Sequence, residues 1–463
     1  MTLNSIQEII AEGTTSDEKK LGLISSIAVV VGNMVGIGIF LTPAEVARAS
    51  PDMLTFVGIW LVGTLMAIAG AQVYAELGVL FPKAGGDYRF LFEAYGPRPA
   101  RAWGWMSVFG CFPASIATLA VGVTVTLSET SMGFFLNNQL LSFHGIHITP
   151  ATFVGLALIW ISTAVNVSGL SISGRTQLLV TLVPILTFVV AGIFATGSSF
   201  GGQASQPNNV VPNISLVTTA LCAVFFTFSG WNVITYLGGE IHRPKLNIPR
   251  VIVAAISITT VIFLILNLSF LSVIPLPRLA ATQNAGVAVA TSIFGDPGRD
   301  IFGLLLAMAI VAGLNATVMA GSRISVAMAE TNQVWRGLAH RSGARETPQR
   351  ALVMQAVIAS VLVLSGSFTM LITVTGGVMI VLSCLTVSTI FVFHRKLCIR
   401  PTSKVWGYPW TAIIYLLAGG SISAMIAIDD IRIFLAGVAA FFLLMYGDLL
   451  NPRAVISKLT KRT

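Results

Sequence analysis

Two long apolar segments of this sequence are interrupted near their centres by glycine and small polar residues. The first segment, residues 23–47, contains GNMVGIGIF at residues 32–40. The second, residues 215–240, contains FFTFSGWNVITYLGGE at residues 225–240. Glycine in a helix interior costs about 1 kcal/mol relative to alanine, so each cluster favours a local break in a helix. The sequence therefore predicts two discontinuous helices.

A broken helix offers backbone groups that can bind a charged ligand without a charged side chain. The half-helix that begins near Ile37 and Gly38 would expose unpaired N–H groups with a partial positive charge, which suits a carboxylate. The half-helix that ends near Met34 would expose carbonyl groups, as would the break between Phe226 and Ser229, and these suit an ammonium group. An anion site beside a cation site fits a zwitterionic α-amino acid, or another small zwitterion.

Close packing is the alternative explanation for the first cluster. Gly32 and Gly36 form a GxxxG pair, and small residues let membrane helices approach one another without forming a site. The second interruption favours a site, because it lies five segments later in the chain. That spacing is expected if the first ten segments form two inverted repeats of five helices. Paired interruptions in corresponding positions of two repeats are typical of the binding site of a transporter.

The segments that carry these breaks are expected to lie in a membrane. Of the 463 residues, 55% are hydrophobic and 10% are charged, whereas soluble proteins carry about 25% charged residues. Apolar runs close to the ~20 residues needed to cross a bilayer recur along the whole chain. The sequence predicts an all-α membrane protein of about twelve transmembrane helices, at residues 23–47, 54–80, 102–128, 150–168, 176–197, 215–240, 251–275, 300–329, 351–367, 370–393, 409–427 and 432–449.

Lysine and arginine are distributed unevenly between the loops that these helices define. One side of the membrane would hold 23 of the 27 and the other side 4, so the positive-inside rule predicts both termini in the cytoplasm. No cleavable signal peptide is apparent, which favours a multi-pass protein of the plasma (inner) membrane. We expect a cytoplasmic segment at 1–20, one transmembrane transport domain at 21–450 and a cytoplasmic tail at 451–463. The longest connections would be residues 129–149, 198–214, 276–299 and 330–350.

The composition argues against several other classes of protein. All five histidines fall in loops or at helix ends, and no HExxH motif occurs, so we expect no catalytic residue, no metal and no cofactor. The net charge of +9 follows from the topology and does not indicate nucleic acid. None of the four cysteines falls in an external loop, so we expect no disulfide-linked subunit. The expected partners are the lipid bilayer and a small-molecule amino acid.

Five motifs, in the right order and each on the expected helix, resemble the amino acid–polyamine–organocation superfamily. The likeness is strongest to its L-type amino-acid transporter branch and the bacterial relatives of that branch. The motifs are LGLISSIAVVVGNMVGIGIF (21–40), YAELGVLFPKAGGDYRFLFEAYGP (74–97), PASIA (113–117), SGWNVITYLGGEIHRPKLNIPR (229–250) and GSRISVAMAE (321–330). The resemblance implies the leucine-transporter fold, with ten helices in inverted repeats plus two more, and transport by alternating access.

The resemblance also implies roles for residues at the first break. Ile37 and Gly38 would offer backbone N–H groups to the substrate carboxylate, and Gly36 would open the break. Met34 would offer a carbonyl group to the amine. Many relatives carry a small residue where this chain has Ile37, which predicts a narrower pocket here.

At the second break, Phe226 and Ser229 would offer carbonyl groups to the amine, with Gly230 between the half-helices. Phe226 also matches the aromatic gate of L-type members, although a phenylalanine that faces only lipid or core would look the same. Asn232 would brace the site, or would only bond across helices for stability. Glu240 would pair with a nearby cytoplasmic arginine as a structural lock, or would have a role in transport.

Two further departures from the family limit what this chain inherits. Several bacterial relatives carry a lysine on the fifth helix, which is thought to replace a sodium ion or to couple protons. Pro184 stands near that position in TLVPILTF. The external cysteine by which animal members join a glycoprotein subunit is absent, which favours a self-sufficient transporter.

The leading hypothesis is a permease for neutral amino acids, either an exchanger or an ion-coupled symporter. A neutral substrate is favoured because no acidic side chain is apparent at mid-membrane. A cationic amino-acid or polyamine transporter is the alternative, with cation–π contacts from Trp105 and Trp231. A non-transporting sensor or channel on the same scaffold is a third hypothesis.

Overall fold

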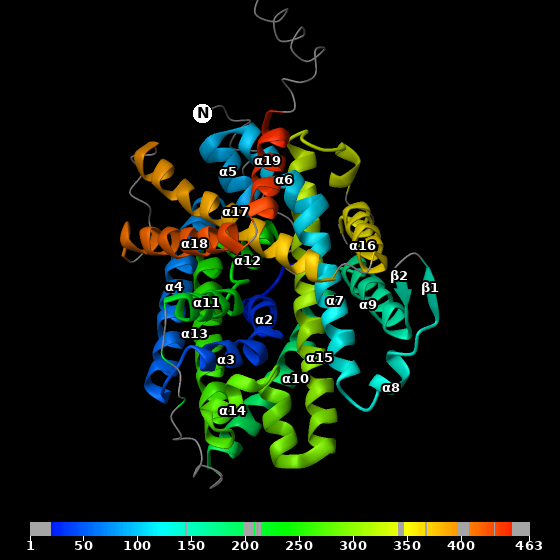
Figure 1. The fold of residues 1–463 in the computed structure, drawn as a ribbon. Coiled ribbons are helices and arrows are strands. Elements are labelled where there is room, and N and C mark those ends of the chain that lie inside the picture. Colours follow the sequence, from blue (N-terminus) through cyan, green and yellow to red (C-terminus); the bar gives the residue numbers. More distant parts are fainter. Residues whose placement is uncertain are drawn as a thin grey trace, which may run out of the picture.

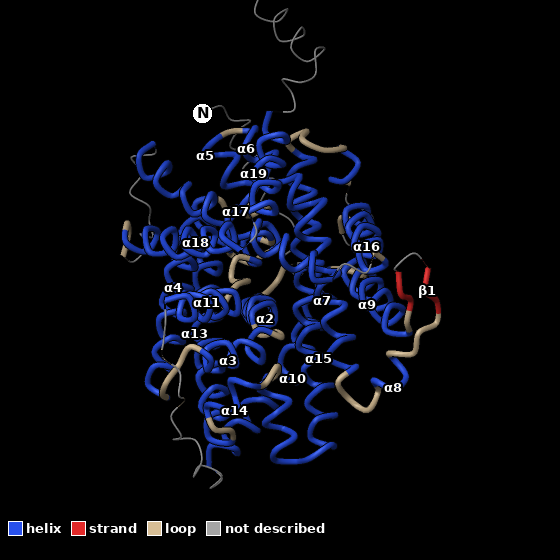
Figure 2. The backbone as a smooth tube through the Cα atoms, viewed as in Figure 1, coloured by secondary structure: helices blue, strands red, loops and turns tan. Residues whose placement is uncertain are grey.

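The structure is a computed structural model that describes residues 20–143, 146–197, 208, 211, 214–340, 347–365, 368–396, 407–429 and 431–446. Helices make up almost all of it (Figures 1 and 2). The helices of the first half are α2 (Leu23–Met34), α3 (Gly38–Arg48), α4 (Met53–Leu80), α5 (Asp87–Tyr95), α6 (Pro97–Met106), α7 (Phe112–Ser128), α8 (Gly133–Leu136), α9 (Pro150–Val167) and α10 (Leu170–Gly197). The predicted terminal segments lie almost wholly outside the described residues.

The second half of the chain continues the bundle. Its helices are α11 (Ile214–Thr227), α12 (Val233–Tyr236), α13 (Pro244–Val273), α14 (Leu276–Ala281), α15 (Ala285–Glu330), α16 (Gln349–Leu364), α17 (Phe368–Lys396), α18 (Trp410–Asp429) and α19 (Ile431–Tyr446). Short non-α turns are η2 (Ser107–Cys111), η3 (Gly238–Glu240) and η4 (Arg336–Ala339), and a small hairpin joins β1 (Leu141–Phe143) to β2 (Ile146–Ile148).

Length and composition identify the candidate membrane spans among the described residues. Six helices are long and apolar enough to cross a membrane, and α2 with α3 makes a seventh span if this bent pair counts as one. Five shorter apolar helices of 10–17 residues lie where the remaining five spans were expected. A multi-pass helical membrane protein is therefore established, while the number twelve stays a prediction.

One expected connection is mostly helical. Residues 276–299 were assigned to a loop, but α14 occupies Leu276–Ala281 and α15 begins at Ala285. The side chain of Asn284 caps α15 by accepting from the Val287 N–H at 3.1 Å. Gly295 then has a φ of +66°, and the chain bends there before continuing to Glu330. A cap and a glycine turn thus let a moderately polar stretch form a helical hairpin.

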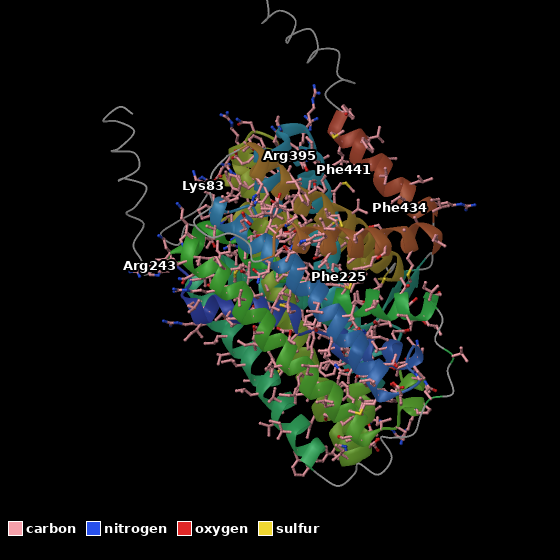
Figure 3. The ribbon with its side chains drawn as sticks, turned by 90° about the vertical axis from the view of Figure 1, so that its left-hand side faces the viewer. Lys83, Phe225, Arg243, Arg395, Phe434 and Phe441 are labelled. Atoms are coloured by element: carbon pink, nitrogen blue, oxygen red, sulfur yellow. The ribbon has the colours of Figure 1, made fainter. Side chains whose placement is uncertain are left out.

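The broken helices lie at the centre of the bundle, where α2, α3, α11 and α12 meet (Figure 1). The helices α5, α6 and α19 gather at one end of the molecule, at the top of Figure 1, and we call it the α5 end. Basic side chains such as Lys83 and Arg395 lie toward this end, as labelled in Figure 3. The helix α14 lies at the opposite end.

Candidate binding site between two broken helices

The first predicted break is present between α2 and α3. The helix α2 ends at Met34, α3 begins at Gly38, and the two are bent by 45°. The Gly36 N–H turns back to the Met34 carbonyl at 3.1 Å. Within the described residues, the backbone N–H groups of Ile37 and Gly38 have no hydrogen-bond partner. The start of α3 therefore has the free donors that an anion needs.

The glycines of this break have different roles. A Cβ atom on Gly32 would lie 2.3 Å from the Thr181 hydroxyl oxygen, so Gly32 serves close packing against α10. A Cβ atom on Gly38 would lie 3.1 Å from the Thr227 hydroxyl oxygen, so Gly38 lets α3 approach α11. A Cβ atom on Gly36 would meet no atom within 4 Å. The packing explanation thus holds for Gly32, whereas Gly36 borders open space.

The second predicted break is also present, and a hydrogen-bonded asparagine joins it to the first. The helix α11 ends at Thr227, α12 begins at Val233, and Gly230 between them has a φ of +114° that only glycine adopts readily. Asn33 on α2 donates from its amide to the Gly230 carbonyl at 3.2 Å. Thr317 on α15 donates to the amide oxygen of Asn33 at 3.3 Å. Sequence reasoning assigned no role to Asn33, although it lies inside the quoted GNMVGIGIF motif.

A cavity of about 350 Å³ lies beside the second break, at the small end of the range of roughly 300–1,000 Å³ for ligand pockets. Four of the predicted site residues line it, namely Phe226, Ser229, Gly230 and Asn232. The other four, Met34, Gly36, Ile37 and Gly38, do not line it. The first break reaches the cavity instead through Asn33. Among the described residues, no group of three or more His, Cys, Asp or Glu is placed to hold a metal ion.

Three buried donors in the cavity wall lack a partner within the described part of the chain. They are the indole nitrogens of Trp103 and Trp231 and the hydroxyl of Thr118. The two indoles are only 4% and 3% exposed. Unpaired buried donors are unfavourable unless a ligand or water supplies an acceptor. They also lie near η2, a π-helical turn of a kind often found at functional sites, whose Ser107 lines the same cavity.

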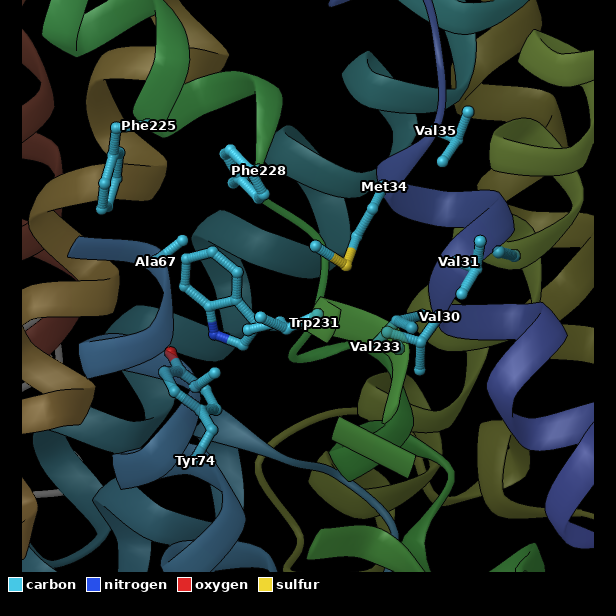
Figure 4. Packing of buried hydrophobic residues seen from close by; sticks show 14 of the residues in the cluster. Val30, Val31, Met34, Val35, Ala67, Tyr74, Phe225, Phe228, Trp231 and Val233 are labelled. Carbon is cyan, nitrogen blue, oxygen red and sulfur yellow. The ribbon is translucent and has the colours of Figure 1, made fainter. Parts of the chain in front are cut away.

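Two adjacent phenylalanines of α11 differ in exposure. Both rings line the cavity, but Phe226 is 37% exposed and Phe225 is 2% exposed. Phe225 packs edge-on against Trp231 at 6.2 Å and lies 5.5 Å from Tyr415, measured between ring centroids. Figure 4 shows Trp231 between Phe228 and Tyr74. This packing fixes the indole, while Phe226 keeps the freedom that a gate would need.

The cavity also contains an acidic side chain that sequence reasoning missed. Asp87, the first residue of α5, lines the cavity and is 1% exposed. The Tyr74 hydroxyl donates to one carboxylate oxygen at 2.5 Å, and the Tyr236 hydroxyl donates to the other. The Asn232 amide donates to the Tyr236 hydroxyl at 3.1 Å. Asp87 was overlooked because it lies outside the apolar segments, and only the fold brings it to the cavity.

One ion pair and one contact between a histidine and a carboxylate join different elements at the α5 end. Glu240 binds Arg323 through three contacts of 3.0–3.2 Å, and Arg323 is 3% exposed. The prediction that Glu240 pairs with an arginine is therefore confirmed. The carboxylate of Glu76 lies 2.8 Å from His394, whose ring stacks on Tyr408 at 3.9 Å.

Uncharged polar side chains of α10 join it to two neighbouring helices. Gln177 donates to the Ala312 carbonyl on α15 at 3.1 Å, and Thr181 donates to the Ala28 carbonyl on α2 at 3.3 Å. Asn315 donates to Gln177 at 2.7 Å. Pro184 lies one turn beyond Thr181 in the same helix. Amide and hydroxyl groups thus connect these helices on the segment that contains Pro184.

One of the two tryptophans named for a cation–π site lies elsewhere. Trp105 stacks on Phe109 at 4.6 Å and donates from its indole to the Gln333 carbonyl at 3.3 Å. It does not line the cavity, whereas Trp103 does. The indole pair that faces the cavity is therefore Trp103 with Trp231.

Comparison with known proteins agrees with this geometry. The family model described as "Amino acid permease" matches residues 21–447. The b(0,+)-type amino acid transporter 1 of Homo sapiens is 28% identical over 369 residues, which cover 78% of this chain and 72% of that protein. The serine/threonine exchanger SteT of Bacillus subtilis is 27% identical over 355 residues, covering 75% and 77%. The large neutral amino acids transporter small subunit 2 of Oryctolagus cuniculus is 26% identical over 450 residues, covering 94% and 82%.

The family model covers nearly the whole chain, and both helix breaks lie inside the matched residues. The relatives are all named as amino-acid transporters or exchangers. This chain belongs to the amino acid permease family, within the amino acid–polyamine–organocation superfamily.

Proposed function

We propose that this protein is a secondary active transporter that carries neutral L-amino acids across the plasma membrane by alternating access. The observation that carries the proposal is the cavity at the helix breaks, with its buried unpaired donors at Trp103, Trp231 and Thr118. Polar groups of a bound substrate, or water held with it, would supply the acceptors that these donors lack. The fold would be the leucine-transporter arrangement, with both termini and the α5 end in the cytoplasm.

The substrate backbone would be held by the two breaks. Its carboxylate would accept from the N–H groups of Ile37 and Gly38, with Gly36 leaving room for the approach. Its ammonium group would donate to carbonyl groups of Met34, Phe226 or Ser229. The Phe226 ring would close over the substrate, and Gly230 and Asn232 would shape the second break. The distance of the first break from the cavity wall would shorten when the transporter closes around its substrate.

A neutral side chain is favoured because the cavity wall is mainly aromatic and hydroxyl-bearing. Two relatives are named as a serine/threonine exchanger and as a large neutral amino acids transporter subunit. A cationic substrate is the second candidate, because Asp87 and the face of Trp231 border the same cavity. The carboxylate of Asp87 is already bound by two tyrosine hydroxyls, which favours the neutral candidate.

Reconstitution into proteoliposomes tests the proposal. Uptake of radiolabelled L-serine, L-leucine and L-arginine is measured with and without internal amino acid, and with imposed proton or sodium gradients. We expect uptake of serine or leucine that arginine does not compete away. Uptake that needs internal amino acid would identify an exchanger, and uptake driven by a gradient would identify a symporter. Uptake of arginine alone would establish the cationic candidate, and no flux under any condition would favour a sensor.

A further inference from the structure

The sequence GGD at residues 85–87 places the start of α5 against α12, the second half of the helix broken at Gly230. Gly85 and Gly86 have φ values of +114° and +47°. The Gly85 N–H donates to the Tyr236 carbonyl at 3.2 Å, and a Cβ atom on Gly86 would lie 2.4 Å from the Tyr236 ring. Two glycines are thus required for α5 to begin directly against α12. This geometry places Asp87 on the hydroxyl end of Tyr236.

The carboxylate of Asp87 holds three elements together at the end of the cavity. The hydroxyl groups of Tyr74 on α4 and Tyr236 on α12 donate to its two oxygens. We call Tyr74, Asp87 and Tyr236 the Asp87 cluster. Hydrogen bonds to an ionised acceptor are about twice as strong as those between neutral groups. The cluster is therefore tightest when Asp87 is ionised.

None of the ion pairs among the described residues includes Asp87. The other titratable groups near the cluster are Cys111 on η2 and Tyr415 on α18. On the elements around it, Arg89 pairs with Glu93, Arg323 pairs with Glu240, His394 contacts Glu76, and Arg101 donates to the carbonyl groups of Leu444 and Met445. Arg98 on α6, Glu330 on α15 and Arg395 on α17 make no ion pair with Asp87 among the described residues. Burial raises the pKa of Asp87, and the bonds from Tyr236 and Tyr74 act in the opposite direction. A buried carboxylate without a cation accepts a proton readily.

We propose that Asp87 is a proton-binding site, and that its protonation loosens the Asp87 cluster and lets the cavity open at the α5 end. A proton from water on that side would bind one carboxylate oxygen, which removes the negative charge and weakens both tyrosine bonds. The change would reach the second break through the bond from Asn232 to Tyr236. The inference rests on the proposed function as a transporter, and it adds control of the transport cycle by pH.

Flux measurements at different pH values test the role of the site. Exchange of radiolabelled L-serine and L-leucine is measured while the pH on the α5 side is varied from about 5 to about 8. We expect flux to rise roughly tenfold as this pH falls through the titration of Asp87. Asp87→Asn should lose that dependence and resemble the protonated protein at every pH. Glu93→Gln, on the same helix, should keep the wild-type profile. A flat wild-type profile, or a wild-type profile in Asp87→Asn, would overturn the proposal.

Substitutions around the carboxylate separate a proton site from a merely structural contact. Tyr74→Phe and Tyr236→Phe each remove a bond to the charged form, so each should move the midpoint of the pH profile upward. His394→Gln removes a histidine that contacts Glu76 and not Asp87, so it should leave the midpoint unchanged. Unchanged midpoints in both tyrosine variants, or a shifted midpoint in His394→Gln, would place the pH response elsewhere.

Infrared difference spectroscopy gives a readout that needs no substrate. Lowering the pH should produce the C=O band of a protonated carboxylic acid in the wild-type protein in lipid, and Asp87→Asn should lack that band. Absence of any difference between the two proteins would overturn the proton site. A titrating band in a protein without amino-acid flux would leave the proton site standing and refute the proposed function. Arginine uptake that Asp87→Asn abolishes without any pH dependence would instead assign Asp87 to a substrate side chain.

Discussion

At the two helix breaks, residues 35–37 and 228–232, the polar groups are backbone groups, amides and hydroxyls, whereas the α5 end uses full charges. Asn33, Gly230 and Thr317 are joined by neutral hydrogen bonds of 3.2 and 3.3 Å. At the α5 end, Arg323 and Glu240 make charged contacts of 3.0–3.2 Å. Neutral bonds contribute about 1 kcal/mol each and break easily. Breaking a buried ion pair leaves an uncompensated charge and costs about 3–5 kcal/mol.

This difference suits the two regions to different tasks. A site that must bind and release its substrate in each cycle needs contacts that exchange at low cost. An end that must stay closed until a signal arrives needs contacts that are strong in one state and weak in another. Asp87 lies where the regions meet, since its carboxylate lines the cavity and also holds α5 to α12.

The largest effect is expected from filling the first break. Gly38→Trp should abolish uptake, because even a Cβ atom at this position would lie 3.1 Å from Thr227. Gly58→Trp, on α4 and outside the proposed site, is the matched control and should retain uptake, because a Cβ atom there meets no atom within 4 Å. Uptake is measured in proteoliposomes at equal amounts of folded protein. Normal uptake by Gly38→Trp would refute the assignment of the first break as a site.

Breaking the ion pair tests whether the α5 end depends on charge. Glu240→Gln should destabilise the protein by about 3–5 kcal/mol, because Arg323 is buried and would lose its anion. The double variant Glu240→Gln with Arg323→Met should recover much of that loss, because no buried charge remains. Thermal unfolding in detergent measures both. A loss of less than about 0.5 kcal/mol in the single variant would show that the α5 end does not depend on this ion pair for its stability.

Removing the bridge between the breaks should have a smaller effect. Asn33→Ala deletes the bonds to the Gly230 carbonyl and from Thr317, which together contribute about 1–3 kcal/mol. We expect uptake at low substrate concentration to fall roughly tenfold, because the breaks lose their alignment. Thr317→Val removes only one of the two bonds, so its uptake should fall less than that of Asn33→Ala. An equal loss in both variants would mean that the Gly230 bond contributes nothing.

The smallest change in stability is expected at the proposed gate. Phe226→Ala should change the free energy of unfolding by less than about 1 kcal/mol, because this ring is 37% exposed, yet it should raise the KM for uptake several-fold. Phe225→Ala should instead lose about 3–5 kcal/mol in stability, because this ring is 2% exposed in packed surroundings. If both variants altered only stability, Phe226 would be a core residue and not a gate.

Local chemistry was enough to predict both breaks from the sequence. Glycine clusters weaken a helix wherever it lies, so the interruptions at Gly36–Gly38 and at Ser229–Gly230 could be placed without a fold. The pairing of Glu240 could also be expected, because a carboxylate near a basic membrane face has arginines in reach. The helical arm before Gly295 was missed because its apolar run, residues 285–294, is too short to cross a membrane.

By itself, the sequence determined that this is a helical membrane protein of the amino acid permease family, because apolar length and the order of the motifs depend only on the chain. The tertiary structure decided which groups share the cavity. Asn33, Trp103 and Asp87 are separated from the second break by more than a hundred residues. Local sequence patterns therefore could not predict that these residues line one cavity. The break at Gly230 could be predicted from the sequence. Its hydrogen bond to Asn33 and its connection to Asp87 through Asn232 and Tyr236 form only when the helices pack together.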